Sequence, residues 1–334
     1  MTQNCPSCYH LRSGKHAILF AQDNLVNNQG SVLLKWLLMH PKTDPAFQNQ
    51  RGGIDMKIPV SVWIDYFKEL PVEQAIQELS AAGFTHGELS IEHLSQLMAK
   101  PNPAATGAAL KAVAQQNGYT IPQGHLSFSG GLVDDSALER LMPELDLFAA
   151  AGIGKAILHT NGGKELTDAV RYERWIHYVR KLSEYVEGTG VTLCIENMYS
   201  VPQCRSVAQI KAIIQDAGGK NLAICLDTGH LHLSNCQKVL QQSQREFILS
   251  ARSLLQALHI TENNGIGDTH QMPFSARYGI DWKEVMQALQ EVDYKGLFNL
   301  EILGERNAPM PIKHAKLAFI QTMCAHMLSD AFIC

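Results

Sequence analysis

The sequence predicts an α/β protein of the (β/α)8 class, a TIM barrel, from two observations. From residue 56 onward, short apolar segments alternate with longer segments of helical period, and the unit occurs eight times. Most of the apolar segments also end in an acid or a histidine. The strands of a barrel place their carboxyl ends, and with them the functional groups, on one face. This pattern therefore favours a closed barrel over an open doubly wound sheet, and no G-x-G-x-x-G follows the first strand to suggest a dinucleotide site.

The elements follow from the period of the apolar residues. Strands are expected at 58–63, 86–91, 119–127, 153–159, 191–196, 222–227, 254–259 and 297–302. Helices are expected at 71–82, 104–117, 135–151, 168–188, 205–217, 236–252, 281–291 and 312–329. The stretches AAGF, AAAGIG and DAGG supply the glycines that commonly end helices.

Composition restricts the class of protein and its partners. Hydrophobic residues make up 46% of the 334 residues and charged residues 18%, enough for a large core. A net charge of −4 gives no basic surface for nucleic acid or an anionic membrane. No apolar run reaches the roughly 18 residues that span a bilayer. The eight cysteines do not resemble a disulfide framework. We expect a cytoplasmic homo-oligomer that acts on a small molecule and has no membrane or nucleic-acid partner.

Residues 1–55 differ from the rest of the chain. They contain CPSC, the Asn/Gln-rich NNQG and the Pro-containing HPKTDP, without a strand–helix unit. We interpret 1–55 as an N-terminal extension of uncertain structure and 56–334 as the barrel.

Four polar residues end the fifth to eighth expected strands: Glu196, Asp227, His259 and Glu301. Alone, each has an ordinary explanation; Asp227, for example, could cap the turn or helix that follows it. Together they place three carboxylates and one imidazole on one face, and buried carboxylates require a cation partner. This donor set suits one divalent ion, Mn, Mg, Co or Zn.

Other polar or aromatic residues near strand ends are candidates for substrate contact. Trp63 ends the first expected strand, and Glu88 lies toward the end of the second. His93, five residues after Glu88, is expected at the surface. The remaining candidates are His125, His159, His230, Asp268 and His270, of which the last two form a D-x-H pair.

Four short motifs in this order resemble the xylose isomerase-like barrel superfamily, which includes ketose 3-epimerases, inosose dehydratases and isomerases, and endonuclease IV. They are IEN at 195–197, LDTGH at 226–230, HITENN at 259–264 and LEI at 300–302. In sugar-converting members a Glu, an Asp, a His and a Glu bind one divalent metal. The resemblance assigns these roles to Glu196, Asp227, His259 and Glu301. It also implies that Glu196 and Glu301 act as acid and base around an enediolate, while His230 contacts substrate hydroxyls.

The sequence also departs from the ketose 3-epimerases. They usually carry an arginine six residues after the metal histidine, and this chain has Gly265 there. A dehydratase or lyase acting on a keto-sugar or keto-cyclitol, including the C-glycoside-cleaving type, fits the same residues. So does a barrel that has lost catalysis and serves as a partner subunit.

Endonuclease IV offers the sharpest alternative, because it binds three zinc ions through nine residues. Nine candidates exist here: His125, His159, Glu196, Asp227, His230, His259, Asp268, His270 and Glu301. A trinuclear zinc phosphodiesterase is therefore chemically possible, although the acidic charge balance argues against a DNA substrate. The metal-dependent sugar isomerase or epimerase is the preferred interpretation.

Overall fold

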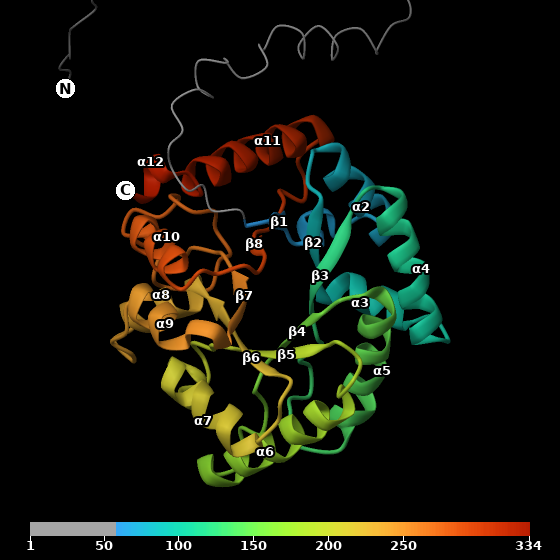
Figure 1. Ribbon diagram of the computed structural model, residues 1–334, viewed down its shortest axis with the longest axis vertical. Coiled ribbons are helices and arrows are strands. Elements are labelled where there is room, and N and C mark those ends of the chain that lie inside the picture. The colour runs from blue at the N-terminus through green and yellow to red at the C-terminus, as the bar shows by residue number, and fades with distance from the viewer. Residues whose placement is uncertain (1–57) are drawn as a thin grey trace, which may run out of the picture. The chain divides into compact units, whose positions relative to one another are not determined.

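The computed structural model describes residues 58–334, so the expected extension at 1–55 lies outside the described residues. Eight parallel strands pair in the order β7-β6-β5-β4-β3-β2-β1-β8. Between β7 and β8, the Ile260 N–H donates to the Asn299 carbonyl at 2.8 Å, and the Glu301 N–H donates to the Ile260 carbonyl at 3.2 Å. The strands thus form a nearly closed ring with helices outside it (Figure 1), which confirms the predicted TIM barrel.

Each of the eight expected strands is present. They are β1 (Val60–Val62), β2 (His86–Leu89), β3 (Thr120–His125), β4 (Lys155–Leu158), β5 (Thr192–Glu196), β6 (Leu222–Asp227), β7 (Leu255–His259) and β8 (Phe298–Leu300). The main apolar core lies between these strands and the surrounding helices, where residues such as Trp175, Phe148 and Leu193 are fully buried.

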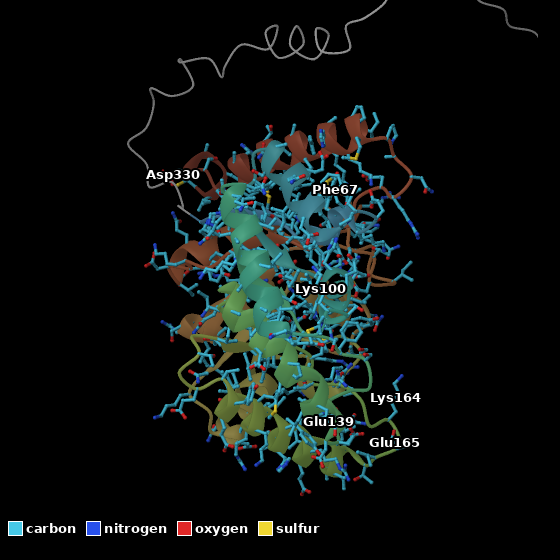
Figure 2. All side chains as sticks on the ribbon, turned by 90° about the vertical axis from the view of Figure 1, so that its right-hand side faces the viewer. Phe67, Lys100, Glu139, Lys164, Glu165 and Asp330 are labelled. Carbon is cyan, nitrogen blue, oxygen red and sulfur yellow. The ribbon has the colours of Figure 1, made fainter. Side chains whose placement is uncertain are left out.

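The helices surround the strands as expected, with three exceptions, of which the last is only the four-residue helix α12 (Asp330–Ile333). The helices are α2 (Val72–Ala81), α3 (Ile91–Met98), α4 (Pro103–Gln116), α5 (Ser136–Ala151), α6 (Asp168–Tyr185), α7 (Val207–Ala217), α8 (Thr228–Cys236), α9 (Gln244–Ala251), α10 (Trp282–Glu291), α11 (Met310–Met327) and α12 (Asp330–Ile333). Short 3₁₀ turns are η2 (Ile64–Phe67), η3 (Pro202–Cys204) and η4 (Arg252–Leu254). Figure 2 views α4 and α5 from outside; exposed side chains such as Lys164 and Glu165 extend from the periphery. No described helix is long and apolar enough to cross a membrane.

The first exception is the single helix expected at 236–252, which is wrong. The helix α8 begins directly after Asp227, and α9 begins at Gln244 with a capping box formed by Ser243 and Glu246. A helix starts at Thr228 because the Asp227 side chain accepts a hydrogen bond from the His230 backbone N–H. Gly229 therefore lies in the first turn of a helix.

The second exception is α3, which the sequence did not lead us to expect. His93 lies on it and is fully buried, so its expected surface position is wrong. Its Nδ1 lies 2.9 Å from Asp65 Oδ1, and its Nε2 donates to the Leu70 carbonyl at 3.0 Å. The ring is buried because both of its nitrogens have partners inside the protein.

The interior of the barrel is divided into an apolar and a polar half. Strands β4 to β7 contribute a small separate apolar cluster of Ile157, Cys194, Ala223, Cys225 and Ala257. Strands β8, β1, β2 and β3 instead contribute the buried polar side chains Asn299, Ser61, Glu88 and Gln123. Both halves lie beneath the carboxyl ends of the strands.

Candidate functional site

The structure brings the four predicted ligands together at the carboxyl ends of their strands. Glu196, Asp227 and His259 are the last residues of β5, β6 and β7, and Glu301 directly follows β8. All four are buried. His259 Nδ1 lies 3.4 Å from Glu196 Oε2 and 3.2 Å from Glu301 Oε2. One donor atom each of Asp227, His259 and Glu301 lies within 4.8 Å of the other two, and Glu196 makes an equally compact group with Asp227 and His230.

Two buried polar atoms of this cluster show that it suits a cation. Among residues 58–334, neither Asp227 Oδ2 nor His259 Nδ1 has a hydrogen-bond partner. The other carboxylate oxygen of Asp227 accepts from the His230 backbone N–H at 2.5 Å, and Asn197 hydrogen-bonds both backbone groups of Asp227. Buried polar atoms are rarely left without partners, and a divalent ion bound between these side chains would satisfy both.

The electrostatics of the cluster point the same way. Burial alone would raise the pKa of Glu196, but His259 and His159 hold it well below the usual range. Burial raises the pKa of Asp227 to about 8, with the Glu196 and Glu301 carboxylates adding to the shift against the effect of His230. Without a cation, the cluster therefore retains protons that a divalent ion would displace.

Two histidines form a wall next to Glu196. His159 Nε2 lies 2.9 Å from Glu196 Oε2 and 3.1 Å from His125 Nε2, so the three side chains make a further compact donor group. Phe128, from the loop after β3, stacks on the His159 ring at 4.8 Å between centroids. Burial lowers the pKa of His159 to about 4, so its ring is neutral near pH 7 and can exchange hydrogen bonds with hydroxyl groups.

A second polar group lies across the cavity from these histidines. Asp268 Oδ2 lies 3.1 Å from His230 Nε2 and 3.6 Å from His270 Nε2. Trp63 stacks on the His270 ring at 5.6 Å and donates from its indole N–H to the Ile302 carbonyl. Burial opposes protonation of His270, but Glu301 and Asp268 raise its pKa to about 10.

These side chains surround one cavity of about 340 Å³, a volume suited to a small ligand. Its lining residues are Trp63, Ile91, Glu92, His125, Phe128, His159, Asn161, Glu196, Met198, Tyr199, Ser200, His230, Asp268, His270 and Glu301. No lysine or arginine is among them. Four lining residues were not expected from the sequence, because they follow strands in loops or helices and carry no motif of their own: Phe128, Glu92, Asn161 and Ser200.

Glu88 is the one candidate for substrate contact that does not line this cavity. Its side chain is fully buried inside the barrel, where it contacts His259, Gln123 and Asn299. A residue enclosed in this way is not placed to touch a ligand in the cavity.

Comparisons with known proteins identify the family. A family model described as xylose isomerase-like TIM barrel matches residues 76–322. The chain belongs to the xylose isomerase-like TIM barrel family. Within this family it is similar to a D-psicose 3-epimerase of Agrobacterium fabrum, with 23% identity over 249 residues that cover 68% of this chain and 77% of the relative.

Solved structures of the same fold include sugar epimerases. The D-psicose 3-epimerase of Clostridium cellulolyticum H10 superposes with a TM-score of 0.66 at 18% identity, covering 81% of this chain and all of that one. A 3-keto-D-glucoside 4-epimerase of E. coli gives a TM-score of 0.63 at 16% identity, covering 80% of this chain and all of that one. At such identities the likeness establishes the fold of this xylose isomerase-like barrel, and the activities named are those of the relatives.

Proposed function

We propose that this chain is a divalent-metal-dependent sugar epimerase or isomerase acting on a keto-sugar or related polyol. One observation carries the proposal: Glu196 and Glu301 both line the cavity and both approach His259 Nδ1. Family membership and the epimerase relatives support the same class of reaction.

Each residue has a role that follows from its position. Glu196, Asp227, His259 and Glu301 would hold the ion, with Mn, Mg, Co and Zn all compatible with three carboxylates and one imidazole. The bound ion would supply Lewis-acid polarisation of a substrate carbonyl. The Glu196 and Glu301 carboxylates, which come from different strands, accept and return the proton α to that carbonyl.

The remaining cavity residues bind and orient the substrate. His125 and His159 on one side, and His230, Asp268 and His270 on the other, offer hydrogen bonds to hydroxyl groups. Trp63 and Phe128 present aromatic faces to the cavity from opposite groups of side chains. The absence of lysine and arginine from the lining favours an uncharged polyol over a phosphorylated one.

A second candidate function is favoured by one further observation. Besides the four ligands, His125 and His159 join Glu196 in one compact donor group, and Asp268 lies between His230 and His270. These nine residues are those that an endonuclease IV-like trinuclear zinc phosphodiesterase would use. The net charge of −4 and the lack of lysine and arginine in the cavity lining favour sugar chemistry over phosphodiester cleavage.

The test combines a metal count with solvent exchange. We expect one divalent ion per chain, and deuterium from D₂O at the carbon next to the carbonyl of a converted ketose. Glu196→Gln and Glu301→Gln should each slow this exchange at least ~100-fold, the lower end of a general-base contribution. The control is Glu291→Gln, which replaces an exposed carboxylate paired with Arg245. This variant should exchange deuterium at the wild-type rate.

Two outcomes would contradict the proposal. If Glu196→Gln and Glu301→Gln both exchange at the wild-type rate, neither glutamate acts as the acid or base. Three zinc ions per chain, with cleavage of abasic DNA and no action on ketoses, would replace it by the phosphodiesterase. Elimination in place of epimerisation, with the same dependence on both glutamates, would instead identify the dehydratase or lyase.

A further inference from the structure

The buried carboxylate of Glu88 lies in the polar half of the barrel interior, beneath the proposed metal site. It accepts hydrogen bonds from the Gln123 amide and from Asn299 Nδ2, the latter at 2.8 Å. Its two oxygens also lie 3.1 and 3.2 Å from His259 Nε2. Within residues 58–334, no lysine or arginine forms an ion pair with Glu88, so the His259 ring is its only ionisable partner.

The neighbours of Glu88 are themselves oriented by hydrogen bonds. Ser61 Oγ donates to Asn299 Oδ1 at 2.7 Å, which turns the Asn299 amide nitrogen toward Glu88. The Gln123 amide nitrogen donates to Glu88 and to the Leu258 carbonyl. Two amides therefore hold the carboxylate in place, and its remaining capacity as an acceptor is directed at His259.

We propose that Glu88 is a positioning residue for metal binding: it accepts the Nε2–H of His259 and thereby fixes the tautomer that leaves Nδ1 free to bind the ion. The inference rests on the proposed metal site but assigns a role to a residue that touches neither ion nor substrate. A neutral imidazole carries one proton, and a proton held at Nε2 leaves the lone pair on Nδ1. Nδ1 is the atom that faces Glu196 and Glu301, and among the described residues it has no hydrogen-bond partner.

The burial of Glu88 favours the same role on energetic grounds. An isolated carboxylate in a dry interior is costly unless it is paired and hydrogen-bonded. Here a cation bound at His259 Nδ1 would compensate the negative charge of Glu88 through the ring. A carboxylate behind a ligating histidine also fixes the ring orientation and makes it a stronger ligand.

The test measures the affinity for Mn²⁺ alone, without substrate, by the free Mn²⁺ signal in electron paramagnetic resonance. Glu88→Gln keeps the size of the side chain but offers a neutral acceptor, and should weaken Mn²⁺ binding by ~10–100-fold, as is typical of such partners. Glu88→Asp keeps the charge but withdraws it from Nε2, so it should also weaken binding; it decides the matter if Glu88→Gln does not fold.

The matched control is Asp65→Asn. Asp65 is also a fully buried carboxylate beside a histidine nitrogen, 2.9 Å from His93 Nδ1, but it lies outside the proposed ligand set. This variant should bind Mn²⁺ as the wild type does, even if it unfolds at a lower temperature. Wild-type affinity in a folded Glu88 variant, or an equal loss in Asp65→Asn, overturns the inference. A wild type that binds no divalent ion overturns the proposed function itself.

Discussion

The two carboxylate oxygens of Asp227 have different surroundings. Oδ1 caps α8 by accepting from the His230 backbone N–H, whereas Oδ2 is buried without a partner among the described residues, beside the other proposed ligands. From the sequence, capping and metal binding were alternative explanations. The structure accommodates both in one side chain, since each uses a different oxygen.

Asp227→Asn should separate capping from metal binding. Asn caps helices about as well as Asp, so the free energy of unfolding in EDTA should change little, whereas Asp227→Ala should lose about 1 kcal/mol. Metal affinity should fall in both variants by more than the ~10–100-fold typical of an outer-shell substitution. Elemental analysis and thermal unfolding in EDTA measure the two effects. If the Asp227→Asn protein still carries one ion per chain, Asp227 is not a ligand.

Glu92 lines the cavity and has the buried acid Asp65 as a neighbour. A hydrogen bond with Asp65, followed by burial, raises the pKa of Glu92 from 4.5 to about 7. Since the folded-state pKa is raised, its contribution to stability is full below about pH 4.5 and is lost as the pH rises through 7. Glu92→Gln should therefore gain melting temperature relative to wild type between pH 4.5 and 8, both measured in EDTA. An unchanged difference across this range would contradict the shift.

At this scale the sequence was most informative where strand ends carry acids or histidines. It identified Glu196, Asp227, His259 and Glu301, because such residues interrupt apolar runs. It could not place Glu88 inside the barrel. In a strand of four residues, the sequence pattern is the same for a side chain in the barrel interior and for one that reaches the cavity at the strand ends. Nor could it find Phe128, which comes from a glycine-rich loop.

Among the elements, the segment between β7 and α10 depends on one buried carboxylate. Glu262 accepts from the backbone N–H groups of Ser275, Ala276 and Ile280 at 2.8, 3.1 and 2.9 Å. It also accepts from the Trp282 indole N–H at 3.2 Å. This arrangement ties down the loop that carries Asp268 and His270 to the cavity.

Glu262→Gln should loosen that loop without removing any cavity side chain. The new amide group would place an N–H donor against backbone and indole N–H groups that are all donors. Each hydrogen bond to a charged group contributes about 1.5–3 kcal/mol to stability, and this contribution would be lost. We expect faster proteolysis between residues 263 and 281 and a lower kcat/KM. Gly279→Ala should act similarly, because an added Cβ would lie 2.0 Å from Glu262 Oε1. A protease-resistant loop in both variants would show that other contacts hold it.

The helices α3 and α8 show why some elements could not be predicted. Each has nine residues or fewer, and each begins within two residues of a strand end, where the sequence suggested a turn or a continuing strand. Short helices have weak periodicity, and tertiary contacts such as those of His93 decide their position. The long amphipathic helices α5 and α6 were predicted within a few residues.

For the whole molecule, the repeated strand–helix unit was sufficient to predict eight parallel strands. The strand–helix alternation is the same in an open sheet and in a barrel. Closure of the ring was therefore inferred from the position of the polar residues at the strand ends. The boundary near residue 56 stays a prediction, as does the assignment of 56–334 to one barrel.

Deletion of residues 1–55 tests that boundary. Because none of the proposed ligands lies there, the truncated chain should fold and bind one divalent ion. Its melting temperature should stay within a few degrees of that of the full chain, which corresponds to a change of ~1 kcal/mol in the free energy of unfolding. Circular dichroism and elemental analysis provide the measurement. Insoluble product, or loss of the ion, would show that the extension belongs to the folded unit.

The apolar half of the barrel interior has a practical consequence through its two thiols. Burial raises the pKa of Cys194 to about 12 and holds that of Cys225 well above its usual range, so neither forms the thiolate that alkylating reagents attack. Of the cysteines in residues 58–334, Cys236 and Cys334 are exposed and would react before the inner pair. The inner pair would be labelled only when β5 or β6 separates from the ring. Those strands end in Glu196 and Asp227, so an ion bridging them would slow the labelling in proportion to its occupancy. The labelling rate of Cys194 and Cys225 therefore reports how often the barrel opens.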